Sequence, residues 1–432
     1  MNASAAAPSD KLDPAPATGT PDQPVGAGER IVTLDFIRGV AVLGILFPNI
    51  VAYGNATLAY NWPKALPGGA EPFDVAVWLF QLVLIDGKFR GLFTLLFGAG
   101  MMLFMERAWA RGATLRLQAR RLFWLALFGL AHFYLLWTGD ILFMYAIAGF
   151  GALAMLKWSA RTQLRVGLAW YLVGALLLTA LIGGQAAMES LPQAQANAPE
   201  QYQQLQEGIG RMIADSEAEG AVMSGGSYAD IVAYRVVEES GGHAEAVFFA
   251  LVETIPLMLI GMALYRMGLF ERRFDRSKMR RWGWIGFLGG AVLTIPFGLL
   301  TISADFPLFL TNFAFNGGTA FLHLPMVLGL AALLSLWAPR VSQGWLGQRF
   351  VAAGRMAFSN YIGGSVVMML VFQGWAGGLY GQFHRLELLG IVLAAWALML
   401  AWSKPWLERF RYGPLEWLWR CLTYGKLFPL RR

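Results

Sequence analysis

The chain has 432 residues, of which 57% are hydrophobic and only 14% are charged. Soluble globular proteins are about 45–50% apolar and about 25% charged, so the composition argues against soluble, fibrous and disordered classes. The net charge of +7 is explained by the basic cytoplasmic loops of a membrane protein. No basic soluble domain for nucleic acid and no metal-binding motif is recognisable, and the single Cys421 excludes an internal disulfide.

The chain divides into three parts by composition. Residues 1–30 are rich in Ala, Pro, Ser, Gly and Asp and lack the apolar core of a signal peptide, so we predict a disordered cytoplasmic tail. Residues 31–403 carry the apolar segments and are predicted to be a polytopic membrane domain. Residues 404–432 are basic and rich in Trp, which predicts a cytoplasmic segment beside the membrane interface.

The apolar segments predict an all-α integral membrane protein with about ten transmembrane helices around a central cavity. A further segment, Phe73–Ile85, is too short to span comfortably, so we predict a re-entrant or interfacial helix. The predicted spans are Leu34–Tyr53, Leu92–Met105, Leu122–Trp137, Ile141–Leu156, Val166–Ile182, Ala244–Tyr265, Trp282–Thr301, Thr319–Trp337, Ala353–Phe372 and Leu386–Trp402.

Loop charges predict the orientation. Basic loops alternate with neutral or acidic ones only if Phe73–Ile85 does not cross, which places both termini in the cytoplasm of a bacterium and the protein in its inner membrane. The segment 183–243 is rich in Asp and Glu, so we predict a long periplasmic loop with helices around Gln201–Ala214 and Tyr228–Glu238.

Polar residues inside apolar segments are the candidate functional residues, because lipid penalises them. At the inner end of the first span, Asp35 and Arg38 are three residues apart and share a helix face. Asn49 follows Pro48 near the outer end. A purely structural role is the alternative for each. Asp35 and Arg38 could anchor the helix at the interface, and Asn49 could bind carbonyls that the proline leaves without a partner.

A second group of charges, Asp86, Lys88 and Arg90, precedes a predicted span that begins outside. Cations there are unusual, which indicates that they face a cavity. The alternative is a snorkelling interfacial group in which the cations pair with Asp86.

His132 lies roughly 7 Å below the outer boundary of its span at 1.5 Å rise per residue, and Asp140 opens the next span after a tight turn. Histidine titrates near neutrality and is the usual general base, and a carboxylate can orient it. These two residues are the candidate catalytic pair. The alternative is a structural hydrogen bond between spans.

Three more polar residues, Glu253, His323 and Asn360, are candidates for lining a substrate cavity, although each alone is more typical of hydrogen bonding between helices. The small-residue runs Gly98–Gly100 and Gly363–Gly364 predict close helix packing. We expect the intramembrane charges to enclose one chamber that is open to the cytoplasm and reaches His132.

Four blocks of the sequence resemble the YeiB-type family of multi-pass membrane proteins, in family order over about residues 31–432. The blocks are Leu34–Ala41 with Asn49, Phe89–Gly100, Gly129–His132 with Gly139–Leu142 and Tyr145–Ala146, and Phe410–Arg420 with Leu422–Gly425.

At fold level that family is similar to the transmembrane acyltransferase superfamily, which includes heparan-α-glucosaminide N-acetyltransferase and bacterial polysaccharide O-acetylases. The resemblance implies that cytoplasmic acyl-CoA or acetyl-CoA donates to a small-molecule or glycan acceptor at the outer side, without a metal. We then expect His132 and Asp140 in catalysis, and Asp35, Arg38, Lys88 and Arg90 at the donor. Asn49, Asp86, Glu253, His323 and Asn360 are expected to line the substrate cavity.

Two other function classes fit the same residues. Intramembrane charges also form the substrate pathways of transporters, so export of a small anionic solute is one alternative. A sensor or scaffold that acts through the acidic segment 183–243 is the other. The expected partners are the lipid bilayer, an acceptor molecule, and a second copy of the chain in a homo-oligomer.

Overall fold

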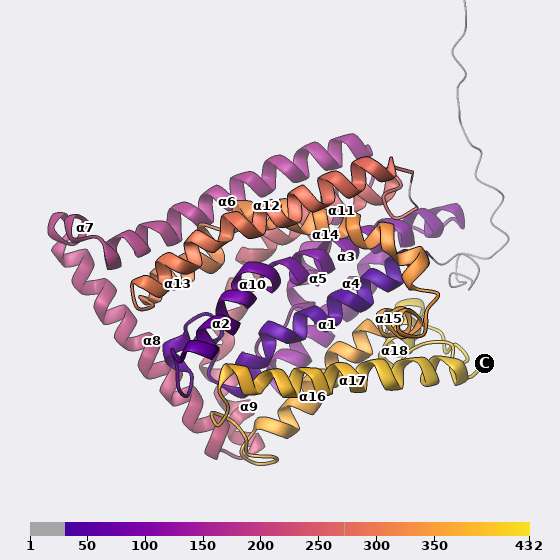
Figure 1. The fold of residues 1–432 in the computed structure, drawn as a ribbon. Helices are drawn as coiled ribbons and strands as arrows, with labels where there is room; N and C mark the ends of the chain where they lie inside the picture. Colours follow the sequence, from indigo (N-terminus) through magenta and orange to yellow (C-terminus); the bar gives the residue numbers. More distant parts are fainter. Residues whose placement is uncertain (1–30, 272) are drawn as a thin grey trace, which may run out of the picture.

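The computed structural model describes residues 31–271 and 273–432, and this part of the chain is all-helical (Figure 1). The predicted disordered tail, residues 1–30, lies outside the described residues. Within the described ranges there is no strand; the extended segments contribute an isolated β-bridge between Phe410 and Arg431. The all-helical class predicted from the sequence is confirmed.

A helix is present at each of the ten predicted spans. These helices are α1 (Val32–Gly54), α3 (Lys88–Ala110), α4 (Leu115–Leu135), α5 (Leu142–Leu153), α6 (Ala160–Ser190), α10 (Gly242–Phe249) continued by the π-turn η6 (Ala250–Thr254) and α11 (Ile255–Arg266), α12 (Arg276–Ser303), α14 (Ala320–Val341), α16 (Ala357–Phe372) and α17 (Arg385–Arg409).

Six helices are long and apolar enough to cross a membrane: α1, α6, the continuous segment Glu239–Arg266, α12, α14 and α17. A seventh crossing is possible at α15 (Trp345–Arg355) and α16, which meet at 85°. The protein is therefore a multi-pass membrane protein. Ten crossings and the orientation stay predictions, since α5 has only 12 residues and α3 and α4 carry charges near their first turns.

Shorter elements complete the chain. They are η2 (Thr57–Tyr60), η3 (Pro63–Ala65), α2 (Pro72–Phe80), the π-turn η4 (Gln81–Ile85), α7 (Pro192–Asn197), α8 (Pro199–Gly225), α9 (Tyr228–Val237), η5 (Glu239–Gly241), α13 (Leu308–Asn312), η7 (Phe313–Gly317) and α18 (Pro414–Tyr424). The predicted helices of the acidic segment are present in α8 and α9, and α8 is longer than expected. The segment Phe73–Ile85 is a short helix followed by a π-turn.

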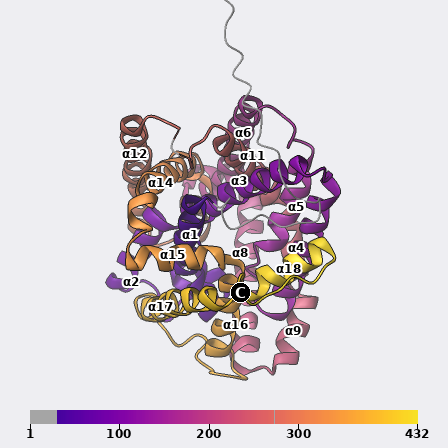
Figure 2. The same cartoon turned by 90° about the vertical axis from the view of Figure 1, so that its right-hand side faces the viewer.

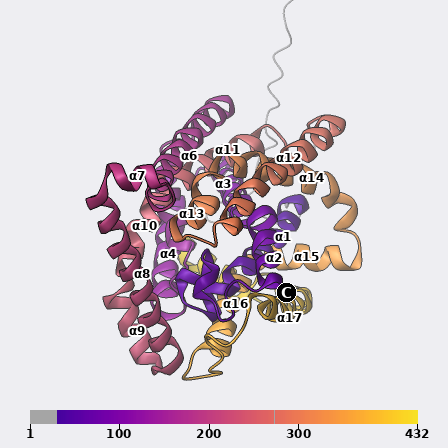
Figure 3. The ribbon, with the colours of Figure 1, turned by 60° about the vertical axis from the view of Figure 1, so that its left-hand side comes forward.

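Helices α1 and α3 contact each other, and α1 packs against α14, α15, α16 and α17 while α3 packs against α11 and α14. In Figure 1, α6, α11, α12 and α14 lie together along the top, and α15 to α18 lie at the lower right. Figure 2 shows α18 beside α4, and the two helices are in contact. Figure 3 shows α7, α8 and α9 along one flank. The end of the molecule that carries Asp35, Arg38 and α18 is called the basic end below.

Glycines allow the closest helix approaches. A Cβ at Gly98 of α3 would collide with the carbonyl of Met258, and a Cβ at Gly261 of α11 would collide with that of Leu95. The packing role predicted for Gly98 is therefore confirmed. In the second run, Gly363–Gly364, the prediction holds for one residue only: a Cβ at Gly364 would lie 3.1 Å from Cε of Met399 of α17, whereas a Cβ at Gly363 would meet no atom within 4 Å. Gly100 faces Arg38 and not a neighbouring backbone.

Candidate functional site

His132 and Asp140 form a buried hydrogen-bonded pair. His132 is in the last turn of α4, and Asp140 follows the tight turn that leads to α5. The imidazole Nδ1 lies 2.9 Å from Asp140 Oδ1, and the two side chains are 0% and 1% exposed. The other oxygen, Oδ2, accepts the N–H of Phe143 at 2.6 Å, at the start of α5. A carboxylate at a helix start is held by such an N–H, so Asp140 is fixed in place and in turn fixes the imidazole.

Two residues that the sequence reasoning missed complete this network. Ser365 of α16 places its Oγ 2.7 Å from His132 Nε2, and Tyr53 of α1 places its Oη 2.6 Å from the same Oγ. Both side chains are buried, and the ring of Tyr53 stacks on Trp137 with centroids 4.0 Å apart. A polar residue in an apolar span was the available signal, but serine at helix interfaces is common enough to be overlooked.

A cavity of about 320 Å³ enters the bundle at the basic end. Six arginines and two carboxylates are among its lining residues: Arg38, Arg107, Arg121, Arg355, Arg411 and Arg420, with Asp35 and Glu416. Asp35 and Arg38 pair at 3.0 Å, and Glu416 accepts hydrogen bonds from α16, so the mouth has an excess of positive charge. The inner part is apolar, with Phe93, Phe97, Leu125, Leu142 and Phe358 in its wall.

The mouth is partly built by α18. The guanidinium of Arg121 lies between the rings of Phe104 and Trp419, at 4.7 and 4.3 Å from their centroids. The indole N–H of Trp419 also donates to the carbonyl of Arg121 at 2.9 Å. Stacked arginines keep their charge while their apolar face is covered, so this contact fixes both the helix and a cation at the mouth.

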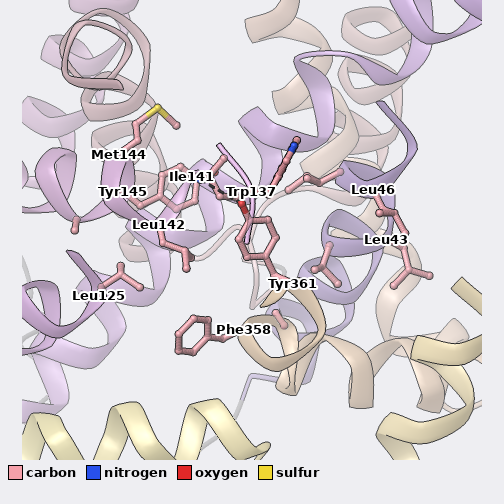
Figure 4. Close-up of a cluster of buried hydrophobic side chains, with 14 of the residues drawn as sticks. Leu43, Leu46, Leu125, Trp137, Ile141, Leu142, Met144, Tyr145, Phe358 and Tyr361 are labelled. Carbon is pink, nitrogen blue, oxygen red and sulfur yellow. Dashed lines mark hydrogen bonds between the residues drawn. The ribbon is translucent and has the colours of Figure 1, made fainter. Parts of the chain in front are cut away.

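Tyr361 separates the cavity from His132. It lines the cavity, whereas His132 does not, and the two rings lie 5.0 Å apart. Its hydroxyl donates to the carbonyl of Gly139 at 3.3 Å and accepts the N–H of Ile141 at 3.2 Å. Figure 4 shows Tyr361 and Phe358 facing Ile141, Leu142 and Leu125. The expectation of an open chamber reaching the imidazole is wrong: a tyrosine ring closes it.

Lys88 and Arg90 do not line the cavity that Asp35 and Arg38 line, contrary to the expectation that all four face one chamber. Arg90 pairs with Glu253 at 3.0 Å, and the buried Lys88 donates to the carbonyl of Leu82 at 2.6 Å. The reason is local: the π-turn η4 ends at Ile85, and Gly87, with a φ of 72°, then turns the chain so that Lys88 points back at the turn. A glycine adopts this left-handed conformation without strain.

The remaining candidates of this region surround the Arg90–Glu253 pair. A small void of about 10 Å³ is lined by both residues and by His323 and Asn316, enough space for about one water. Asp86 lies to one side and accepts the hydroxyl of Tyr60 at 2.5 Å. These charges form a second polar cluster, distinct from the basic cavity.

Asn360 and Asn49 have different surroundings. The amide of Asn360 donates to the carbonyl of Ala353 and to Ser403 Oγ, both at 3.1 Å, and accepts the indole N–H of Trp402 at 2.8 Å. Asn360 therefore joins α16 to α17 and does not face the cavity. Asn49 is half-buried one residue after the proline inside α1.

Glu71, Asp74 and His384 bring one ligand atom each within 4.8 Å of one another. Asp74 also accepts the N–H of Leu386 at 2.8 Å and faces His384 Nδ1 at 3.2 Å. Asp74 thereby binds α2 to the first turn of α17. The sequence shows no metal motif, and this was the reason to expect a metal-free protein. That expectation stays a prediction.

The fold and the site define a class: a multi-pass α-helical membrane protein with a basic cavity beside a buried polar network. Comparison with known proteins identifies the family. Residues 264–426 match the family model described as "Protein of unknown function (DUF418)". The chain is 33% identical over 415 residues to "Uncharacterized protein YeiB" of Escherichia coli (strain K12), covering 93% of this chain and 98% of that protein.

A second relative is "Uncharacterized protein YxaH" of Bacillus subtilis (strain 168), 30% identical over 431 residues, with 95% of this chain and 98% of that protein covered. The chain belongs to the YeiB-type family of uncharacterised multi-pass membrane proteins. No solved structure matches the chain.

Proposed function

We propose that this protein transfers an acyl group from an acyl-CoA donor to a hydroxyl or amine of an acceptor. The observation that carries the proposal is the relation between the cavity and the polar network. A cavity with a cationic mouth and an apolar inner part ends at Tyr361, and the His132–Asp140 pair lies directly behind that ring. This arrangement fits a ligand that is anionic at one end and carries a reactive group at the other.

The donor would enter with its acyl end first. Its phosphates would stay at the arginines of the mouth, where guanidinium groups bind phosphate oxygens through paired N–H donors. The apolar wall formed by Phe93, Phe97 and Leu142 would surround the pantetheine arm. A volume of about 320 Å³ is in the usual range for a small-molecule site. Asp35 would hold Arg38 in place through their ion pair.

Once Tyr361 turns aside, the thioester carbonyl would reach the network. A carboxylate can only accept, so Asp140 fixes the proton on His132 Nδ1 and leaves Nε2 as the nitrogen that can take up a proton. His132 would take the proton of the attacking group and later return it to the departing CoA sulfur, which leaves as a thiol. Lys88 and Arg90 lie outside the cavity and have no part in donor binding in this proposal.

The predicted orientation gives the reaction its direction. With the basic end in the cytoplasm of the inner membrane, donor would enter from inside, and a small-molecule or glycan acceptor would approach from the outer side. A homo-oligomer in the bilayer is compatible with this arrangement.

The test is transfer by purified protein in lipid nanodiscs. Protein is incubated with acetyl-CoA labelled in the acetyl group, with and without a mixture of cell-envelope glycans, and the label is followed into product while free CoA is measured. We expect CoA release that depends on His132. CoA binding without any thioester cleavage would contradict acyl transfer, and movement of an anionic solute across vesicles would then favour the transporter alternative.

A further inference from the structure

We infer that Ser365 is the nucleophile that first receives the acyl group, so that transfer passes through an ester on the protein. This inference rests on the proposed acyl transfer and specifies its chemistry. The sequence predicts His132 as a general base, and in the proposed function it takes its proton from the attacking group. The structure instead gives His132 a hydroxyl of its own: Ser365 Oγ lies 2.7 Å from Nε2, and Asp140 Oδ1 lies 2.9 Å from Nδ1. These are the distances of a nucleophile, base and orienting acid.

With a neutral imidazole, the short contacts define one order of donors. Because Asp140 accepts from Nδ1–H, the neutral imidazole has no proton on Nε2, and Ser365 must donate to it. In this arrangement the proton of Ser365 lies toward Nε2 at 2.7 Å and not toward its other acceptor, the carbonyl of Tyr361 at 3.2 Å. Tyr53 then donates to Ser365 Oγ. Every donor therefore points from Tyr53 through Ser365 and His132 to Asp140. This is the order that a serine needs in order to lose its proton as it attacks.

The same geometry disfavours direct attack by an acceptor. The one lone pair on His132 Nε2 is occupied by Ser365, so an acceptor hydroxyl would first have to displace that serine. Ser365 is fully buried and is held from the other side by Tyr53, whose ring stacks on Trp137. Displacing it would leave buried polar groups without partners, which costs free energy.

Tyr361 and Ser365 are four residues apart on α16 and share one face of that helix. Tyr361 lines the cavity, and Ser365 Oγ lies 3.2 Å from the carbonyl of Tyr361, one turn deeper. A rotation of the Tyr361 side chain would thus open the end of the cavity onto Ser365 without moving the helix.

The reaction balances in two steps. First, Ser365 Oγ attacks the thioester carbonyl as its proton moves to His132 Nε2; the C–S bond breaks, and His132 protonates the sulfur. Second, the acceptor hydroxyl or amine loses its proton to His132 and attacks the ester carbonyl; the C–Oγ bond breaks, and Ser365 recovers a proton. Tyr53 is a positioning residue, since its hydroxyl orients Oγ and then hydrogen-bonds the ester oxygen.

The experiment uses p-nitrophenyl acetate as an acyl donor that does not need the CoA site. Full-length protein in nanodiscs is mixed with this ester in the absence of acceptor, p-nitrophenolate release is followed, and peptides are mapped by mass spectrometry. We expect a burst of about one p-nitrophenolate per protein molecule, and an acetyl group on Ser365. Ser365→Ala should abolish the burst, and His132→Asn should slow it by about a hundredfold or more.

Two further variants control for folding. Ser365→Cys keeps a nucleophile of similar size and should become acetylated as a thioester, which hydroxylamine cleaves. Ser335→Ala removes another fully buried serine, on α14, whose hydroxyl has no hydrogen-bond partner among the described residues. This variant should retain the full burst.

The outcomes separate this inference from the proposed function. If Ser365→Ala still transfers the acetyl group of acetyl-CoA, or if the wild type shows no acetyl group on Ser365, the nucleophile assignment is overturned and acyl transfer stands. If Ser365 is acetylated by the ester but acetyl-CoA is never cleaved, the nucleophile stands and the CoA-dependent function fails.

Discussion

The ring of Tyr361 lies 5.0 Å from the ring of His132, and only the tyrosine lines the basic cavity. The tyrosine is held closed at two points, since its hydroxyl bonds the carbonyl of Gly139 and the N–H of Ile141. Those two atoms flank Asp140. The group that closes the cavity is therefore attached to the same turn that positions the candidate acid.

Removing this ring should expose His132. In Tyr361→Ala, we expect diethyl pyrocarbonate to modify His132 about ten times faster or more than in wild type, measured by mass spectrometry of the α4 peptide. Tyr361→Phe is the matched control, because it keeps the ring and loses only the hydroxyl. Equal rates in wild type and Tyr361→Ala would show that the ring is not what shields the imidazole.

The arginines at the mouth should bind the anionic part of the donor. We expect Arg38→Gln and Arg121→Gln each to weaken CoA binding by about tenfold, the usual effect of losing one charged hydrogen bond. The salt dependence of binding should also become shallower. Titration of CoA at two salt concentrations measures both effects. Arg340→Gln changes an exposed arginine outside the cavity and should bind CoA as wild type does.

Gly98 should be far less tolerant of substitution than Gly100, two residues away on α3. A Cβ at Gly98 collides with the carbonyl of Met258, so Gly98→Ala should destabilise the fold by about 1–3 kcal/mol. A Cβ at Gly100 would lie 3.6 Å from Arg38 Nη2, an ordinary contact. Thermal unfolding of both variants in one detergent compares them, and similar losses would contradict the packing argument.

The stability of the acidic segment 183–243 should depend on pH through Glu219 of α8. This carboxylate accepts the N–H and hydroxyl of Thr57 at 2.9 and 3.0 Å, and burial raises its pKa from 4.5 to about 7. Arg235 opposes the rise and Glu239 adds to it. The folded state thus binds the proton more tightly than the unfolded chain. The resulting stabilisation is complete below about pH 4.5 and is lost as the pH rises through about 7.

The rise in the pKa of Glu219 from 4.5 to about 7 corresponds to a contribution of about 3 kcal/mol to the free energy of unfolding. We expect the melting temperature of the wild type to fall between pH 5 and pH 8, and Glu219→Gln to reduce that fall. Melting curves across this range, recorded in one detergent, measure the effect. If the slope of melting temperature against pH is unchanged in Glu219→Gln, another group is responsible for the pH dependence.

The sequence predicted the helical class and the helix positions because apolar length is a local property. The His132–Asp140 contact was also predictable, since only a tight turn separates the two residues. The contacts of Ser365 and Tyr53 were not, because Ser365 of α16 is 233 residues from His132 in the chain, and Tyr53 of α1 joins the network through Ser365, 312 residues away. The separation of Arg90 from Arg38 depends on a π-turn and a left-handed glycine, which hydrophobic periodicity does not reveal.

Glu416 of α18 accepts the N–H groups of Phe358 and Ser359 at 2.8 and 3.0 Å, and the Ser359 hydroxyl at 2.5 Å. The first N–H groups of a helix have no partner within it, so the C-terminal segment serves as the N-cap of α16 from a distance. Deleting that segment would remove a wall of the cavity and fray the helix that carries Tyr361 and Ser365. A C-terminal tag is therefore best joined after Arg432, with the last helix left intact.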